Sequence, residues 1–458
     1  MGLPGLAWVI IMPAANHLRN LRVQATLEDL YTRITGDEDA RVCKDIPDEA
    51  CNDQPRNFFA YLGANLLGKV ADEVASAKLV IPWMFGALGV PAFYTGFLVP
   101  IREAGVLLPQ LLVAAAVRHL PVRKYVWMFG ALLSAASLLG MAAAALALDG
   151  GNAGAAVVAM LVVFSLARGI CSVSAKDVLG KTISKSRRGI LMGWSASLSG
   201  VALLAVGAWL AVFDPQTSGI GVFAGLLAAG GVLWILSTLL FATIEEQPGA
   251  TEGGGNAISV ALGQLGLLAA DRPFRRFVAI RTLLLAVALA PPFYALVAQQ
   301  QNQAGLSGLG ALIVANGLAS SISSPFWGYL GDRSSRAVMA LASTGAGLLA
   351  VLTWTAITLE WQWLTGQLGF ALIFLVLNVM HGGVRLGRKV YLVDMATAET
   401  RAAYVAVSNT VIGVMMLLGG LIGFVADWLG APAILLLLGL LSLIAAAGAL
   451  RLPQVSEP

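Results

Sequence analysis

The chain is built from long apolar segments joined by polar stretches, and basic residues occur in only every second polar stretch. Each apolar segment is long enough to cross about 30 Å of hydrocarbon at about 1.5 Å per residue of helix. Because basic connections remain on the cytoplasmic side during insertion, we expect an even number of spans with both termini in the cytoplasm. The twelve predicted spans are residues 58–86, 90–118, 124–148, 153–175, 189–213, 219–243, 276–298, 307–330, 337–358, 363–385, 402–426 and 431–450.

The composition excludes an ordinary soluble globular protein. Hydrophobic residues make up 58% of the chain and charged residues 12%, and the mean hydropathy is +0.80. The 51 glycines suit helices that pack closely in lipid. The net charge of +4 arises from the basic connections, so it indicates contact with the lipid bilayer and no nucleic-acid partner.

The sequence contains no residue pattern typical of an enzyme or a cofactor site. It has no G-x-x-x-x-G-K-S/T loop, which disfavours ATP-driven transport, and no Ser/His/Asp set can be placed together. The three His residues are not at ligand spacing from the cysteines. Cys43, Cys51 and Cys171 are odd in number, and we expect free thiols instead of a disulfide framework. We therefore expect no catalytic residue, no metal and no cofactor.

Two polar regions divide the chain. Residues 1–57 precede the first span and carry leucines at helical spacing between charged residues, which predicts an amphipathic helix on the inner membrane surface. Residues 244–275 follow the sixth span, and their Gly-rich start predicts a flexible cytoplasmic linker. The predicted organisation is a first bundle over residues 58–243, a second bundle over 276–452 and a cytoplasmic tail over 453–458.

The second half of the chain repeats the first at an offset of 213 to 216 residues. An offset that places six spans on six spans preserves their orientation, so we expect parallel repeats related by an axis along the membrane normal. The matched pairs follow one another in order: Gly89 with Gly305, Pro109 with Pro325, Arg123 with Arg336, Gly169 with Gly382, Lys176 with Lys389 and Ser195 with Ser408.

Two six-helix bundles in parallel repeat, joined by a cytoplasmic linker, resemble the major facilitator superfamily over about residues 58–452. The sharpest local match is the connection between spans eight and nine, which is similar to the family's G-x-x-x-D-R-x-G-R/K-R/K loop. Ser335 and Ala337 depart from that pattern, and the equivalent connection after span two has no Asp. The residues of the loop are Gly328, Gly331, Asp332, Arg333 and Arg336.

The resemblance implies an all-α membrane protein that works by alternating access, with this loop as part of a gate. Gly328 and Gly331 would let span eight approach a neighbour without a Cβ in the way. By the repeat symmetry, Asp332 would accept hydrogen bonds from the start of span five near Gly189, where the helix dipole favours an anion. That contact would hold the two halves together on the inner side.

Seven charged residues remain after those of the connections, the tails and the helix ends are set aside, and we assign all seven to the first bundle. A charge at the bilayer centre costs roughly 2.5–3.5 kcal/mol on insertion scales, so these side chains should face a wet cavity or one another. On an ideal helix Asn65, Lys69, Asp72, Glu73 and Ser76 share one stripe about 100° wide. The seven residues are Lys69, Asp72, Glu73, Lys78, Arg102, Glu103 and Arg168.

Three interpretations of these charges remain open from the sequence. In the leading one, Asp72 or Glu73 takes up and releases a proton, with Arg102 as counter-charge. In the second, Arg102, Lys69 and Arg168 bind an anionic group of the substrate. In the third, closed ion pairs of Lys69 with Glu73 and of Asp72 with Arg102 neutralise one another and serve only the structure.

Uncharged polar side chains in the spans are candidates for hydrogen bonds to a solute, although such residues also join neighbouring helices. With the resemblance, they predict a monomeric secondary active transporter of the plasma (inner) membrane that moves a small organic solute, with protons as the coupling ion. An uncoupled facilitator, or a non-transporting sensor or scaffold on the same fold, is the alternative. The candidate residues are Asn65, Ser76, Asn316, Asn378, His381 and Asn409.

Overall fold

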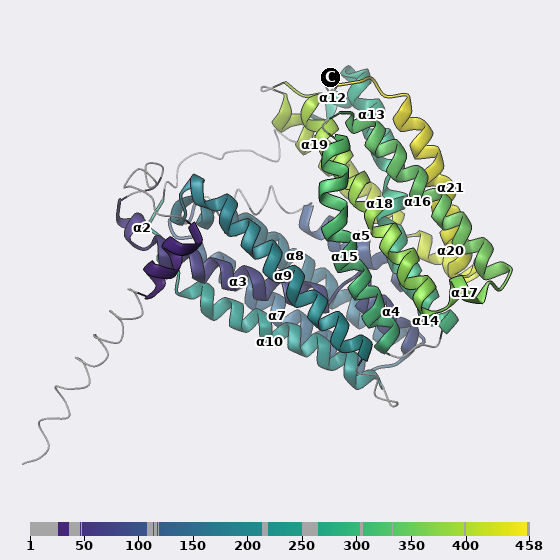
Figure 1. Cartoon of the computed structure of the whole chain (residues 1–458), viewed down its shortest axis with the longest axis horizontal. Coiled ribbons are helices and arrows are strands. Elements are labelled where there is room, and N and C mark those ends of the chain that lie inside the picture. The colour runs from purple at the N-terminus through teal and green to yellow at the C-terminus, as the bar shows by residue number, and fades with distance from the viewer. Residues whose placement is uncertain are drawn as a thin grey trace, which may run out of the picture.

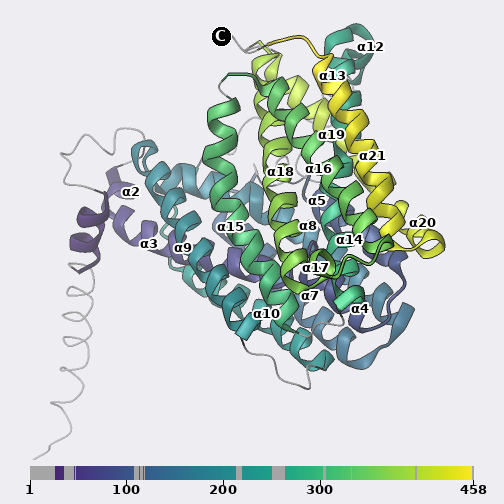
Figure 2. The same cartoon turned by 45° about the vertical axis from the view of Figure 1, so that its right-hand side comes forward.

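The computed structural model describes residues 26–35, 46, 48–107, 113, 117, 119–212, 219–249, 264–302, 306–331, 333–397 and 400–455. Within these residues every regular element is a helix, and none is a strand. The first half of the chain (residues 48–249, purple to teal) and the second half (residues 264–455, green to yellow) form two groups of helices that lie side by side in both views (Figure 1, Figure 2).

Helices of each half pack mainly against helices of the same half, and the halves contact each other through α9 with α15, α5 with α14, α19 and α20, and α4 with α14. The first half contains α2 (Asp48–Asn52), α3 (Gln54–Val74), α4 (Val80–Ala87), α5 (Ala92–Leu107), α7 (Lys124–Ala147), α8 (Gly150–Thr182), α9 (Lys185–Val212) and α10 (Ile220–Ala242). The second half contains the 3-10 turn η1 (Gln264–Gly266) and α12 (Leu267–Ala270), α13 (Arg272–Leu283), α14 (Leu285–Asn302), α15 (Leu306–Gly331), α16 (Ser335–Thr358), α17 (Gln362–Thr365), α18 (Gln367–Asp394), α19 (Arg401–Gly419), α20 (Ile422–Leu429) and α21 (Ala431–Leu450).

Ten helical stretches in the described part of the chain are long and apolar enough to cross a membrane, which makes this a multi-pass membrane protein. Each coincides with one of the predicted spans three to twelve, so those ten predictions are confirmed. The first two predicted spans differ. The first is divided into α3 and α4, and the second is described over Ala92–Leu107 as α5.

A break at residues 75–79 separates α3 from α4. Pro82 has no N–H to bond the carbonyl of Lys78, and its ring would clash with that carbonyl, so a regular helix is disfavoured through this turn. The backbone forms a wider turn, in which the N–H of Ile81 donates to the carbonyl of Ser76 at 3.1 Å. The prediction of one continuous span over residues 58–86 is therefore wrong.

Two helices extend beyond the predicted ends of their spans. Helix α8 continues to Thr182 and α18 to Asp394, whereas the predicted spans end at 175 and 385. Hydropathy marks the limits of the hydrocarbon and not the end of a helix, because long basic side chains can reach the interface from a helix that continues into it. Basic residues assigned to connections, such as Lys181 and Arg388, therefore lie on helices.

The helix over residues 26–35 packs on the first half of the protein. The hydroxyl of Tyr31 accepts a hydrogen bond from Nε2 of Gln54 at 2.7 Å, and its ring lies edge-on to Phe58 with the centroids 5.4 Å apart. The guanidinium of Arg187 donates to the carbonyl of Thr35. Residues 26–35 therefore form a helix that packs on α3 and α9. Its predicted place on the inner membrane surface stays a prediction.

The cysteines differ from the expectation of free thiols. Cys171 is a free thiol buried in α8, whereas Cys51 takes part in a disulfide bond. The prediction is therefore wrong for Cys51, because an odd number of cysteines does not show which thiols the fold brings together. Cys43 lies outside the described residues.

The two halves touch most closely where their helices carry glycines. A Cβ on Gly96 of α5 would lie 2.5 Å from the carbonyl oxygen of Gly420, and a Cβ on Gly310 of α15 would overlap the backbone of Ala211 in α9. The N–H of Phe93 also donates to Oδ1 of Asp427 at 3.1 Å. All of these contacts lie toward the ends of the helices whose connections lack basic residues.

The opposite part of α9 is free of such contacts. A Cβ added to Gly189, Gly193 or Gly200 would meet no described atom within 4 Å. Toward the other end of the same helix, a Cβ on Gly207 would lie 2.9 Å from a methyl group of Ile313 on α15. The halves are therefore closed toward the non-basic connections and separated along the basic part of α9.

Candidate functional site

A cavity of about 390 Å³ lies between the two halves. It is bounded by α3, the break at 75–79 and α5 on one side and by α15 and α18 on the other. Its volume is in the range of small-molecule sites. The polar residues that line it are Asp72, Glu73, Ser76, Lys78, Arg102, Glu103, Asn316, Ser320, Ser323, Asn378, His381 and Arg385.

The break between α3 and α4 forms part of the cavity wall. Ser76 and Lys78 lie in the break and both line the cavity. Irregular backbone at membrane depth is tolerated where it lines a wet cavity, and in transporters it supplies polar groups at the solute site. Pro82 thus produces, through the broken helix, a polar surface that an uninterrupted span would not offer.

Two arginines from neighbouring helices hold the carboxylate of Asp72. Its Oδ2 accepts hydrogen bonds from Nη2 of Arg102 at 3.2 Å and from Nε of Arg168 at 3.1 Å. Arg168 also lies over the ring of Trp234, 4.3 Å from its centroid. Oδ1 of Asp72 is buried and has no hydrogen-bond partner within the described part of the chain. The predicted pair of Asp72 with Arg102 is confirmed, and Arg168 completes it.

The other two carboxylates of the cavity differ in their pairing. Glu103 lies 3.8 Å from Nζ of Lys78, which gives Lys78 the partner on another helix that the sequence left unnamed. Glu73 forms no ion pair within 4.0 Å in the described residues, so the predicted pair with Lys69 is wrong. A spacing of four residues on a helix allows that pair but does not ensure it. Of the two residues, only Glu73 lines the cavity.

The second half contributes one face of α18 and part of α15. Asn378, His381 and Arg385 follow one another at three and four residues on α18, and all three line the cavity. Nδ2 of Asn378 donates to the carbonyl of Phe374 at 2.8 Å, which leaves its side-chain oxygen to face other partners. Asn316 lines the cavity from α15. The structure thus brings together the candidates Ser76, Asn316, Asn378 and His381.

Four of the predicted site residues do not line the cavity. Asn65 and Lys69 lie on α3 away from it, and Arg168 contributes only through Asp72. Asn409 is behind the wall, where its Oδ1 accepts a hydrogen bond from Arg281 at 3.0 Å. Helical angles show which residues share one face of a helix, but they do not show which neighbouring helix covers that face.

Arg281 is the charged residue that reasoning from the sequence missed. It lies inside the predicted span 276–298 and is buried, with 8% of its surface exposed. The same criterion that selected the charges of the first bundle, a charge within an apolar segment, would have selected it. Arg388, assigned to a basic connection, also belongs to a helix face, since it continues the stripe of His381 and Arg385 on α18.

The residues of the predicted gating loop are arranged differently from the expectation. A Cβ on Gly331 would lie 3.1 Å from Leu386, so this glycine does permit a close approach. A Cβ on Gly328 would meet nothing within 4 Å among the described atoms, so the same prediction is wrong for Gly328. Asp332 lies outside the described residues, and its predicted contact with α9 stays a prediction.

The basic residues of that loop bond within the second half. Nη2 of Arg333 donates to the hydroxyl of Tyr329 at 2.6 Å. Nη1 of Arg336 donates to the carbonyl of Leu452 at 2.9 Å. Both contacts fix the loop to the end of its own half.

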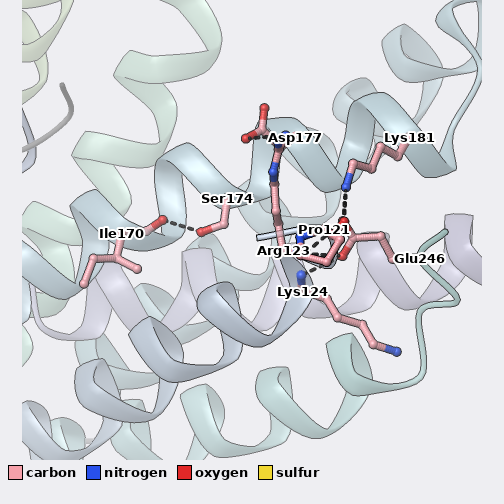
Figure 3. A network of polar contacts seen from close by, with 8 residues as sticks. All are labelled: Pro121, Arg123, Lys124, Ile170, Ser174, Asp177, Lys181 and Glu246. Carbon is pink, nitrogen blue, oxygen red and sulfur yellow. Dashed lines mark hydrogen bonds and ion pairs between the residues drawn. The ribbon is translucent and has the colours of Figure 1, made fainter. Parts of the chain in front are cut away.

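Figure 3 shows a second polar network, at the start of α7. The carboxylate of Glu246 is fully buried and accepts hydrogen bonds from the backbone N–H groups of Arg123 at 2.9 Å and Lys124 at 2.6 Å. It also accepts from Nζ of Lys181 on α8 at 2.8 Å, and Arg123 pairs with Asp177 at 3.2 Å. Hydrogen bonds therefore hold the first residues of the predicted flexible linker at the start of α7 and the end of α8.

Comparison with known proteins agrees with this architecture. The second half matches the family model of the Major Facilitator Superfamily over residues 277–458. No curated protein matches the chain. Among solved structures, a variant of the nucleoside transporter NupG is 13% identical, with a TM-score of 0.69 over 86% of this chain and 99% of its own.

Two further structures share the fold at similarly low identity. A variant of the peptide transporter POT in complex with sulfate is 13% identical, with a TM-score of 0.67 over 90% of this chain and 98% of its own. A D-xylose-proton symporter is 13% identical, with a TM-score of 0.65 over 88% of this chain and 99% of its own. The family match therefore covers the second half of the chain, residues 277–458, and most of the chain shares the fold of these transporters.

Proposed function

We propose that this protein is a secondary active transporter that moves a small organic solute across the plasma membrane by alternating access, with protons as the coupling ion. The observation that carries the proposal is the polar cavity of about 390 Å³ between the two halves, lined by charged residues of both. Nucleoside, peptide and xylose transporters share this fold. Sites at the interface of two repeats are where secondary transporters bind their substrates.

The proposed membrane arrangement has twelve spans in two bundles of six, over residues 58–243 and 276–452, with both termini in the cytoplasm. The glycine contacts of Gly96 and Gly310 close the halves toward the non-basic connections. If those connections face outward, as the positive-inside rule predicts, the described state is closed outside and open toward the cytoplasm. Rocking of one half against the other around the cavity would then give the opposite state.

Within this scheme Glu73 is the proposed proton carrier. It lines the cavity and has no ion-pair partner in the described residues, so it can change its charge without breaking an ion pair. Asp72, in contrast, is bound by Arg102 and Arg168, and protonating it would leave two guanidinium groups without a counter-charge. Asp72 is therefore proposed to fix the helices around the cavity.

Reconstitution into liposomes that contain a pH-sensitive dye tests this function. Uridine, dialanine, D-xylose and succinate are added one at a time, and uptake of the labelled solute is measured beside the internal pH. We expect one solute to enter together with protons in the wild type. Glu73→Gln should still exchange that solute across the membrane but move no protons, whereas Glu245→Gln, at an exposed carboxylate, should behave as the wild type.

The alternatives give different results in the same experiment. Uptake without proton movement in the wild type would identify an uncoupled facilitator. A solute that binds but is never taken up, in any lipid mixture, would identify a sensor or scaffold. Loss of proton movement in Asp72→Asn alone, with normal coupling in Glu73→Gln, would transfer the proposed role to Asp72.

A further inference from the structure

A buried arginine that pairs with no carboxylate in the described part of the chain lies behind the cavity wall of the second half. Arg281 on α13 donates to Oγ of Ser408 at 2.6 Å and to Oδ1 of Asn409 at 3.0 Å, both uncharged acceptors. Its Nε is buried and has no hydrogen-bond partner in the described residues, and only 8% of the residue is exposed. Burying a guanidinium is unfavourable unless an anion balances it.

Two more arginines share one face of α18. Arg385 lines the cavity, and Arg388 follows it by three residues on the same face. Arg388 is within electrostatic range of both Arg281 and Arg385. The carboxylate of Glu103 faces Arg385 and Arg388 from the first half, but its ion pair is with Lys78. None of the three arginines forms an ion pair in the part of the chain that the structure describes.

The charges around the cavity do not balance, and the imbalance belongs to one half. In the first half Lys78, Arg102 and Arg168 are matched by Asp72, Glu73 and Glu103, three against three. Among the described residues of the second half, Arg385 lines the cavity, Arg388 follows it on α18, Arg281 is buried on α13, and no carboxylate lines the cavity from this half. An excess of three positive charges therefore lies on the side of the cavity formed by α13 and α18.

We propose that the transported solute is an organic anion, whose carboxylate or phosphate group binds at Arg385 and Arg388 with the buried charge of Arg281 behind them. Guanidinium groups bind planar carboxylates and phosphates through paired hydrogen bonds. His381 and Asn378, about one and two turns along the same face, would contact the rest of the solute. This inference rests on the proposed function, since it names the class of solute for the same cavity.

A soluble anion fits this position better than a lipid headgroup. Arg385 lines a cavity that lies between the two halves of the protein, and Arg281 is buried on α13. Basic residues that bind headgroups lie instead next to the bilayer, and the exposed residues Arg276 and Lys389 do not line the cavity. The soluble and the lipid source share one chemistry, an anionic oxygen group, so the experiment must separate them.

Thermal unfolding of the protein in nanodiscs of phosphatidylcholine, which carries no net charge, tests the site without transport. Succinate, lactate, glycerol phosphate and inorganic phosphate are each titrated against chloride at constant ionic strength. We expect at least one to raise the melting temperature of the wild type. Arg385→Gln and Arg388→Gln should weaken that effect roughly tenfold or more, because each removes a charged hydrogen-bond donor. Lys389→Gln, an exposed neighbour on the same helix, should leave it unchanged.

Each outcome decides between the inference and its alternatives. If none of the anions stabilises the wild type, or if Lys389→Gln weakens the effect as much as Arg385→Gln, the proposed anion site is wrong. Stabilisation only in nanodiscs that contain phosphatidylglycerol, lost in Arg388→Gln, would identify a lipid site and overturn the proposal. Uptake of uridine or D-xylose that persists in Arg385→Gln would reject an anionic solute while keeping the transporter function. Anion binding without uptake would keep the site and reject transport.

Discussion

The Oδ2 atom of Asp72 lies 3.0 Å from Nη2 of Arg168, and the same oxygen lies 3.2 Å from Nη2 of Arg102. One carboxylate therefore joins α3, α5 and α8 at the edge of the cavity. Because one negative charge serves two guanidinium groups, its loss affects more than one pair.

We predict that Asp72→Asn destabilises the protein by about 2–4 kcal/mol, since it leaves two mostly buried arginines without a counter-charge. The apparent melting temperature in detergent measures this. The double variant Asp72→Asn with Arg168→Gln should recover part of the loss, because one of the unpaired charges is then removed. Asp149→Asn, at an exposed carboxylate, is the control, and an equal loss there would contradict the interpretation.

Adjacent glutamates after α10 offer a matched pair. Glu246 is fully buried with three donors, whereas the side chain of Glu245 is 48% exposed and lies 3.3 Å from Arg56. Glu246→Gln should lower stability by roughly 2–4 kcal/mol, because Lys181 and two backbone N–H groups lose a charged acceptor. Glu245→Gln should cost at most about 1 kcal/mol. Equal effects on the melting temperature would show that the network in Figure 3 does not stabilise the first half.

The glycine contacts between the halves predict an effect of one added methyl group. Gly96→Ala places a Cβ 2.5 Å from the carbonyl oxygen of Gly420, so α5 and α19 must separate, at a cost of about 1–3 kcal/mol. We expect a lower melting temperature and slower solute exchange. Gly328→Ala meets no described atom within 4 Å and should be neutral or stabilising by up to about 1 kcal/mol. If both variants behave alike, the closed end does not depend on this contact.

The N-terminal region separates a transporter from a sensor. Deletion of residues 1–25 keeps the contact of Tyr31 with Gln54, so a transporter should retain its rate of solute uptake. Deletion of residues 1–50 removes that contact and the acceptor of Arg187, and should lower the melting temperature. Normal folding with complete loss of uptake in the shorter deletion would favour a role of the N-terminal region in signalling.

Much of the architecture could be predicted because a bilayer imposes simple rules. A run of apolar residues of sufficient length must form a helix with satisfied backbone hydrogen bonds, and ten predicted spans were confirmed on that basis. The rule fails where charge and proline interrupt the run. The first span contains Lys69, Asp72, Glu73 and Lys78, and Pro82 divides it into two helices.

The site was only partly predictable. A charge within an apolar segment is a local signal, and it selected Asp72, Arg102 and Arg168, which the structure joins in one network. The pair of Lys69 with Glu73, in contrast, was inferred from helical spacing and is absent in the described structure. Spacing within one helix gives no information on which side the neighbouring helices cover.

The sequence by itself determined the membrane class, most of the spans and the charges that lipid would not tolerate, because each depends on the local pattern of apolar and charged residues. Only the tertiary structure decided which charges share the cavity. It set Arg385 of α18 opposite Glu103 of α5 and left Arg281 buried beside Ser408 without a carboxylate. The residues in these contacts are at least 127 positions apart in the sequence. The packing of whole helices brings them together.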